Sequence, residues 1–261
     1  PVPPQARTLC PPAGQAGIRR QMEQLKREYE KQDRMRRDFT ANVSHELKTP
    51  LTSISGYAEI IREGMVKSED VGRFAGKIYE EAQRLITLVG DILNLSHLDE
   101  GAPGQERRQG IDLYALCERA VASLAEAARQ RGIAISLTGS RQRVDGAEKL
   151  LAEIIFNLCD NAIKYNRPGG TVDIELKKTS SGVILRVANT GAAIPADSIP
   201  HIFERFYRAD ASRSREVPGT GLGLSIVKHI CEIHSAVISV TSESDNTVFT
   251  VQWPSDPGVM M

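Results

Sequence analysis

The sequence predicts an α+β protein in which a long helical hairpin precedes an α/β sandwich. Between residues 18 and 100, apolar side chains recur at helical spacing. From residue 111 onward, helical patterns are interleaved with the short alternating patterns that are typical of strands. The length of 261 residues also exceeds the roughly 100 to 200 residues of one domain. We therefore divide the chain into an N-terminal segment (1–17), a helical domain (18–101), a linker (102–110), a sandwich domain (111–256) and a tail (257–261).

Composition excludes several classes of protein. Lys and Arg number 33, as do Asp and Glu, so no net charge favours duplex DNA or an anionic membrane surface. The four cysteines form no CxxC pair, which argues against a zinc site or a disulfide framework and fits core thiols in a reducing cytoplasm. No apolar run approaches the ~20 residues of a membrane span. We expect the segment to be soluble, with any membrane contact made through an upstream region.

The first helix is predicted from residue 18. Residues 1–17 contain five prolines, and we expect them to be disordered. The run from 18 to 48 contains no Gly or Pro, and its apolar residues follow the 4-3-4 spacing of a helix-pairing seam. They are Ile18, Met22, Leu25 and Tyr29, with Phe39 and Val43 resuming the register after an interruption. The alternative is a single solvated helix.

A second helix is predicted from an N-cap at Ser68 to about Gly101. Its apolar stripe consists of Val71, Phe74, Ile78, Leu85, Val89 and Ile92. Two helices with one narrow stripe each bury too little apolar surface alone, so a second hairpin is needed. We therefore expect a homodimer built around a four-helix bundle.

The segment from Gly101 to Gly110 is rich in glycine and charge, and we interpret it as an interdomain linker. Helices are predicted after it at 113–131, 148–165 and 222–234. Strands are predicted at 133–137, 172–176, 183–187, 237–240 and 248–251, from alternating apolar residues. This order favours an α+β sandwich with helices on one face of the sheet.

The first candidate site is a histidine on the first helix. His45 lies two residues from both Val43 and Leu47, roughly 200° from each around a helix, so we expect it to face solvent. Glu46 follows directly and could orient the imidazole or accept its proton, and Thr49 lies on the same face one turn later. Pro50 can bend the helix beside this position. A neutral imidazole is a competent nucleophile near neutral pH.

The segment SHELKTP resembles the H-box of two-component sensor histidine kinases. The resemblance implies that His45 is the phospho-acceptor and that Glu46 acts as acid or base. It also implies that Thr49 positions the water that hydrolyses phosphohistidine when the protein acts as a phosphatase.

The helix predicted at 148–165 carries the second candidate site. Asn157, Asn161 and Lys164 share one helical face, where two mid-helix asparagines have a propensity cost. The segment resembles the N-box of the same family. The resemblance implies that Asn157 coordinates Mg²⁺, Asn161 contacts ATP, Lys164 contacts a phosphate and Tyr165 packs on adenine. An amide oxygen suits a magnesium ion that bridges phosphate oxygens.

A glycine-rich loop opens the helix predicted at 222–234, and glycine lets backbone N–H groups approach an anion at a helix N-terminus. This loop resembles the family's G2 box, which implies nucleotide contacts from Gly219, Thr220, Gly221, Leu222 and Gly223. The preceding IFERFYRADASRSREV resembles the F-box and ATP lid. There Phe203 and Phe206 would anchor the lid, and Arg208 would neutralise charge on the transferred phosphoryl group.

The G1 box departs from the family pattern. It reads Asn189-Thr190-Gly191-Ala192-Ala193 where the family has D-x-G-x-G. Asn189, Gly191 and Ile194 are still assigned to the nucleotide, and Asn189 can accept a hydrogen bond from the adenine amino group. Losing the charge weakens that contact by about 1 kcal/mol. Ala193 costs little unless its position needs a positive φ. A second departure is Ser235, where glycine commonly follows the histidine.

The resemblance covers about Arg34 to Trp253, with five boxes in the family's order. It implies autophosphorylation of His45 from ATP and Mg²⁺, followed by transfer to an aspartate in the receiver domain of a response regulator. Two alternatives stay open. One is an ATPase with the same nucleotide fold, in which Glu153 activates water; the other is a pseudokinase that dimerises and binds a regulator.

Overall fold

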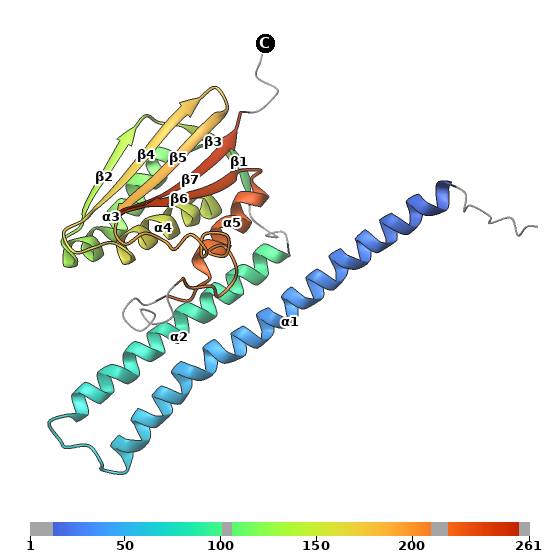
Figure 1. The fold of residues 1–261 in the computed structure, drawn as a ribbon. Coiled ribbons are helices and arrows are strands. Elements are labelled where there is room, and N and C mark those ends of the chain that lie inside the picture. Colours follow the sequence, from blue (N-terminus) through green and yellow to red (C-terminus); the bar gives the residue numbers. More distant parts are fainter. Residues whose placement is uncertain (1–12, 101–105, 210–218, 256–261) are drawn as a thin grey trace, which may run out of the picture.

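The computed structural model describes residues 13–100, 106–209 and 219–255. A helical hairpin extends from a sandwich of one sheet and three helices, and its second helix lies against the sandwich (Figure 1). The α+β architecture predicted above is confirmed. Among the described helices, none combines the length and the apolar composition that a membrane span requires.

The hairpin consists of α1 (Ala13–Arg62) and α2 (Val71–Asp99). Residues 13–17 are helical, so the predicted disorder is wrong there. The prolines of the N-terminal segment end at Pro12, and the next proline is Pro50, so no proline interrupts the helix at residues 13–17. The prediction for residues 1–12 lies outside the described residues. Pro50 lies inside α1 and does not end it. Between the two helices, Tyr57 and Phe74 pack edge to face with ring centroids 5.7 Å apart.

The sandwich has a five-stranded sheet in the order β2-β4-β5-β7-β6. Only the β2–β4 pair is parallel. The strands are β2 (Ala134–Gly139), β4 (Thr171–Thr179), β5 (Gly182–Thr190), β6 (Val237–Glu243) and β7 (Asn246–Pro254). Helices α3 (Leu113–Gln130), α4 (Glu148–Lys164) and α5 (Gly223–Ile233) cover one face of this sheet, as the sequence predicted (Figure 1).

A two-stranded ribbon was missed. β1 (Arg107–Asp112) pairs antiparallel with β3 (Arg143–Ala147), with Arg107 opposite Ala147. Residues 107–110 are therefore a strand and not linker, and ordered structure begins before Ile111. The reason is that side chains 107–109 are exposed and charged or polar, so they show no apolar alternation. Residues 101–105 and the predicted tail at 257–261 lie outside the described residues.

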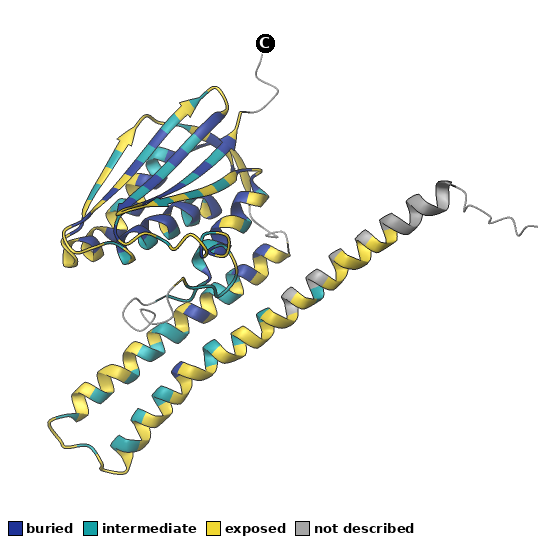
Figure 2. Cartoon of the chain, in the orientation of Figure 1, coloured by how far each residue is buried: buried dark blue, intermediate teal, exposed yellow. Residues whose placement is uncertain are grey.

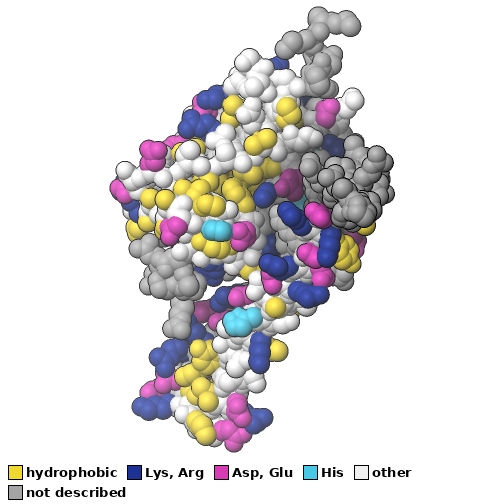
Figure 3. All heavy atoms as spheres, turned by 45° about the vertical axis from the view of Figure 1, so that its right-hand side comes forward, with side chains coloured by type: hydrophobic (Ala, Val, Ile, Leu, Met, Phe, Trp, Pro, Cys, Tyr) yellow, Lys and Arg dark blue, Asp and Glu magenta, His cyan; other side chains and the backbone are white. Residues whose placement is uncertain are grey.

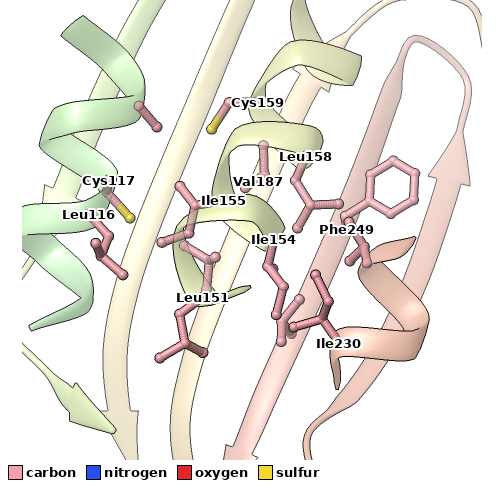
Figure 4. Close-up of a cluster of buried hydrophobic side chains, with 14 of the residues drawn as sticks. Leu116, Cys117, Leu151, Ile154, Ile155, Leu158, Cys159, Val187, Ile230 and Phe249 are labelled. Atoms are coloured by element: carbon pink, nitrogen blue, oxygen red, sulfur yellow. The ribbon is translucent and has the colours of Figure 1, made fainter. Parts of the chain in front are cut away.

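The core lies between the sheet and its three helices. In β4 and β5, buried residues alternate with more exposed ones, whereas the hairpin is mostly exposed (Figure 2). Ile154, Ile155 and Leu158 of α4 are fully buried, in a cluster that also contains Cys159 (Figure 4). Cys117, Cys159 and Cys231 are buried free thiols, and burial raises the pKa of Cys117 to about 12. The predicted core thiols are confirmed at these three positions, and Cys10 lies outside the described residues.

Candidate functional site: an exposed histidine beside the sandwich domain

His45 lies on the exposed face of α1, as the helix geometry predicted. Its side chain is 81% exposed, and its Nδ1 lies 3.8 Å from Glu46 Oε1. Thr49 Oγ1 donates a hydrogen bond to the His45 carbonyl oxygen at 3.2 Å, so the hydroxyl lies on the same side of the helix. The imidazole is accessible, with a carboxylate next to it.

The F-box of the sandwich lies against this part of α1. A pocket of about 300 Å³ is lined by Asn42, His45, Glu46 and residues 204–207. Phe206, which lines this pocket, packs against the Phe39 ring with centroids 5.7 Å apart, and the Arg205 guanidinium lies 5.2 Å from the Phe39 centroid. The predicted lid anchor therefore also contacts the helix that carries the histidine.

The predicted N-box residues lie together on one face of α4. Asn157, Asn161 and Lys164 are partly exposed, whereas Ile155, Leu158 and Ala162 on the opposite face are buried. Lys164 Nζ forms a 2.6 Å ion pair with Asp160, which lies one turn earlier. Tyr165, the C-cap of the helix, is 51% exposed. The polar face that the sequence predicted is thus present.

Asn157 can hold a metal ion with its amide oxygen. Its Nδ2 donates to the Glu153 carbonyl at 3.1 Å, which directs Oδ1 away from α4. A Cβ added to Gly223 would lie 3.1 Å from that Oδ1, so the oxygen faces the N-terminus of α5. A hard cation bound there would lie beside the glycine-rich loop, where phosphates are expected.

The glycine-rich loop is joined to the F-box. Phe206 N–H donates to the Gly221 carbonyl at 2.9 Å, and Arg208 Nη1 donates to the Gly219 carbonyl at 3.0 Å. Gly221 has a φ of +72°, and an added Cβ would lie 2.9 Å from Phe206 Cα. Glycine is therefore required at 221 by conformation and by space. The lid residues 210–218 lie outside the described residues.

The G1 box lies next to the C-terminus of α4. Asn189 is buried, and its Nδ2 donates to the Thr190 carbonyl at 3.1 Å. A Cβ added to Gly191 would lie 2.4 Å from the Tyr165 carbonyl oxygen, so this glycine allows close approach of the N-box. Ile194 N–H donates to Ser242 Oγ at 2.8 Å. Ala193 does not have a positive φ, so alanine causes no backbone strain there.

Three polar residues of α2 belong to this region and were missed in the sequence. Thr220 Oγ1 donates to Asp91 Oδ2 at 2.6 Å, and Asn94 Nδ2 donates to Glu153 Oε1. Asp99 forms a 2.7 Å ion pair with Arg205. None of the three belongs to the apolar stripe predicted for this helix; they lie on the side of α2 that carries the buried Leu88, Leu95 and Leu98. Their partners are more than 50 positions away, so no local pattern could have revealed them.

The structure thus brings the predicted residues into two groups. His45, Glu46 and Thr49 lie beside the F-box, while the N-box, the G1 box and the glycine-rich loop meet around the ends of α4 and α5. Among the described residues, no hydrogen bond or ion pair joins His45 to Asn157, Asn161 or Lys164.

Comparisons with known proteins agree with this arrangement. The model of the His Kinase A (phospho-acceptor) domain matches residues 35–101. The model of the histidine kinase-, DNA gyrase B- and HSP90-like ATPase matches residues 146–257. The sensor-like histidine kinase SenX3 of Mycolicibacterium smegmatis is 37% identical over 232 residues, which cover 88% of this chain. The chain spans 60% of that relative's length.

Solved structures show the same fold. Histidine kinase ThkA in complex with the response regulator protein TrrA superposes with a TM-score of 0.68 at 24% identity, over 89% of this chain and 67% of ThkA. Full-length ShkA in complex with AMPPNP superposes with a TM-score of 0.60 at 26% identity, over 83% of this chain and 45% of ShkA. Together with the two matched domains and the exposed His45, these similarities show that the chain belongs to the sensor histidine kinases of two-component systems.

Proposed function

We propose that this chain is the catalytic part of a sensor histidine kinase, which transfers the γ-phosphoryl group of ATP to His45 and then to an aspartate of a response regulator. The observation that carries the proposal is the exposed His45 imidazole beside an F-box that is hydrogen-bonded to the glycine-rich loop. A nucleophile and a nucleotide fold thus occur in one chain. ThkA, which has the same fold, is described in complex with a response regulator.

The proposed reaction divides the chain by task. Residues 18–101 would form the dimerisation and phosphotransfer domain, and residues 111–256 the catalytic domain. An imidazole nitrogen of His45 attacks the γ-phosphorus in line, ADP leaves, and Glu46 accepts the imidazole proton. Arg208 neutralises charge on the phosphoryl group. When the protein acts as a phosphatase, Thr49 positions a water that hydrolyses phosphohistidine.

Nucleotide binding is assigned to the three boxes around α4 and α5. Asn161, Lys164 and the backbone of residues 219–223 hold the phosphates, while Asn189, Gly191, Ile194 and Tyr165 surround the adenine. Asn157 supplies an oxygen to Mg²⁺, which when bound would offset the charge of the triphosphate. Glu153, the candidate base of the ATPase alternative, accepts a hydrogen bond from Asn94 in this conformation, which disfavours water activation.

The test is incubation of the purified chain with γ-labelled ATP and Mg²⁺, with His45→Gln and Asn161→Ala alongside. We expect acid-labile, alkali-stable label on the wild-type chain and none on His45→Gln, because only the former has the nucleophile. Asn161→Ala should bind ATP poorly and label poorly. His97→Gln, at an exposed histidine of α2, serves as the matched control and should label normally.

The other outcomes separate the alternatives. ATP binding without label on any variant would contradict the kinase and support the pseudokinase. Steady ATP turnover without protein label, abolished by Glu153→Gln, would support the ATPase.

A further inference from the structure

The phosphate end of the proposed nucleotide site is in contact with the phosphotransfer helix. Asp91 of α2 accepts the Thr220 hydroxyl hydrogen at 2.6 Å. That hydroxyl oxygen in turn accepts from Leu222 N–H at 3.3 Å, at the start of α5. The Asp91 carboxylate is therefore linked, through one hydroxyl, to the N-terminus of an eleven-residue helix.

A cation completes the surroundings of this carboxylate. Burial raises the pKa of Asp91, so holding this anion here has a desolvation cost. The Thr220 hydrogen bond and the charge of Lys164, the residue assigned to a phosphate, favour the ionised form, and the charge of Asp160 opposes it. A hydroxyl donor, a helix N-terminus and an ammonium group are also what a phosphate group requires.

The contact is reinforced one turn along α2. Asn94, three residues after Asp91, donates to the Glu153 carboxylate on α4. Residues three apart lie on the same side of a helix, so both side chains reach the sandwich together. Glu153 lies one turn before Asn157, the assigned magnesium ligand, and its pKa is also raised by burial. The α2 helix thus covers the metal and phosphate end of the site.

We propose that Asp91 acts as an internal stand-in for a nucleotide phosphate, so that docking of α2 on the sandwich and binding of a triphosphate exclude each other. The proposal rests on the proposed function, because it needs ATP in the site around α4 and α5. A triphosphate arriving at Thr220 and Lys164 would meet the Asp91 carboxylate at close range, in a partly desolvated site. The repulsion grows with the number of phosphates and ends when α2 separates.

Separation would also leave the assigned nucleotide residues free to approach His45, because among the described residues no hydrogen bond or ion pair joins His45 to Asn157, Asn161 or Lys164. By linkage, if ATP binding favours the undocked state, undocking raises the affinity for ATP by the same factor. Asp91 would therefore make the docked state selective against ATP more than against nucleotides with fewer phosphates. It would hold the kinase inactive until ATP displaces it.

The experiment measures dissociation constants for ATP, ADP and adenosine, with Mg²⁺, on the wild-type chain and on Asp91→Asn. Asparagine keeps the shape and a hydrogen-bond acceptor but removes the charge. We expect ATP to bind about tenfold more tightly to Asp91→Asn, ADP to gain less and adenosine to be unchanged, from the charge interaction removed. Glu80→Gln, an exposed acid on the same helix that pairs with Lys77, is the matched control and should change none of them.

Two results would overturn the inference in distinguishable ways. An equal gain for all three ligands, or no gain, would show that Asp91 does not compete with phosphate, provided that Asn161→Ala still abolishes ATP binding. Failure of every variant to bind ATP, or ATP binding that Asn161→Ala leaves intact, would instead overturn the proposed nucleotide site and the inference with it.

Discussion

Ser235 is a residue-scale departure whose cost the structure explains. It follows the C-cap of α5 with a φ of +54°, and Ala236 N–H donates to the Cys231 carbonyl at 2.8 Å. Together with the bond from Ser235 N–H to Glu232, this is the helix-ending motif in which glycine is preferred. Ser235 is also the position at which the family pattern commonly has glycine after the histidine.

We expect Ser235→Gly to raise the free energy of unfolding by about 1 kcal/mol, because glycine removes the strain of the left-handed conformation. Ser235→Ala keeps a Cβ and should give no such gain. Urea denaturation can be followed by the fluorescence of Trp253, the single tryptophan, which is buried in β7. Equal stability of the two variants would contradict this account.

His234 makes a second residue-scale link, from the end of α5 to the start of α4. Its Nε2 accepts from Ala147 N–H at 3.1 Å, and its Nδ1 lies 2.8 Å from the Ile230 carbonyl. The ring must therefore be neutral, with its proton on Nδ1. Burial lowers the pKa of His234 below its ordinary value of about 6.5.

This pKa predicts a loss of stability in acid. Above about pH 6.5 the ring is neutral in both states, and the stability is fully present. As the pH falls toward the lowered folded pKa, the unfolded chain binds a proton that the folded chain does not, so the unfolding free energy falls by at most about 1.4 kcal/mol per pH unit. Urea denaturation at several pH values should show a flatter profile for His234→Gln. The same flattening in His97→Gln would contradict the assignment.

At the scale of elements, the F-box and the glycine-rich loop behave as one unit. The Phe206 backbone lies at a φ of +65°, unusual for a bulky residue, and is held by its hydrogen bond to Gly221. The unit also contacts α1 through Phe39. Movement of the F-box must therefore change the contacts of both the glycine-rich loop and α1, the helix that carries His45.

We expect Gly221→Ala to weaken ATP binding by about tenfold, since a side chain there strains the backbone by roughly 1–2 kcal/mol. It would also overlap the Phe206 backbone. Gly219→Ala should cause a smaller loss, because a Cβ at 219 meets no atom within 4 Å in the rest of the described chain, its sequence neighbours apart. Calorimetric titration with ATP compares the two, and equal losses would show that the junction with Phe206 is unimportant.

At the scale of the whole molecule, the hairpin exposes apolar side chains that a second copy would cover. Tyr79, Ile86 and Leu93 recur every seven residues on α2 and are 66%, 64% and 57% exposed. Seven-residue spacing is typical of a seam between helices. Figure 3 shows hydrophobic side chains exposed on the hairpin, among charged side chains of both signs. The predicted homodimer would bury this row.

We expect the double variant Ile86→Glu and Leu93→Glu to be monomeric, because carboxylates in an apolar seam lose their hydration. Sedimentation equilibrium over a concentration series gives the stoichiometry. Glu80→Lys changes charge on the same helix but outside the row, and should leave a dimer. A wild-type monomer at all concentrations would contradict the predicted four-helix bundle.

The sequence by itself determined the fold class, most elements and the boxes. Helical and alternating periodicities placed α3 and α4 within one residue of their observed bounds, because those elements bury one apolar face against the sheet. His45 was predicted to face solvent from its spacing to Val43 and Leu47, and it does. The periodicity failed at β1, whose residues 107–109 are exposed.

Only the tertiary structure decided how the two parts of the chain meet. Asp91, Asn94 and Asp99 are ordinary polar residues of an amphipathic helix until their partners at Thr220, Glu153 and Arg205 are known. The physical reason is that polar contacts between distant segments are directional and carry no repeating pattern along the chain, whereas burial of an apolar face does. The proposed competition between Asp91 and phosphate therefore depends on docking, which no local pattern encodes.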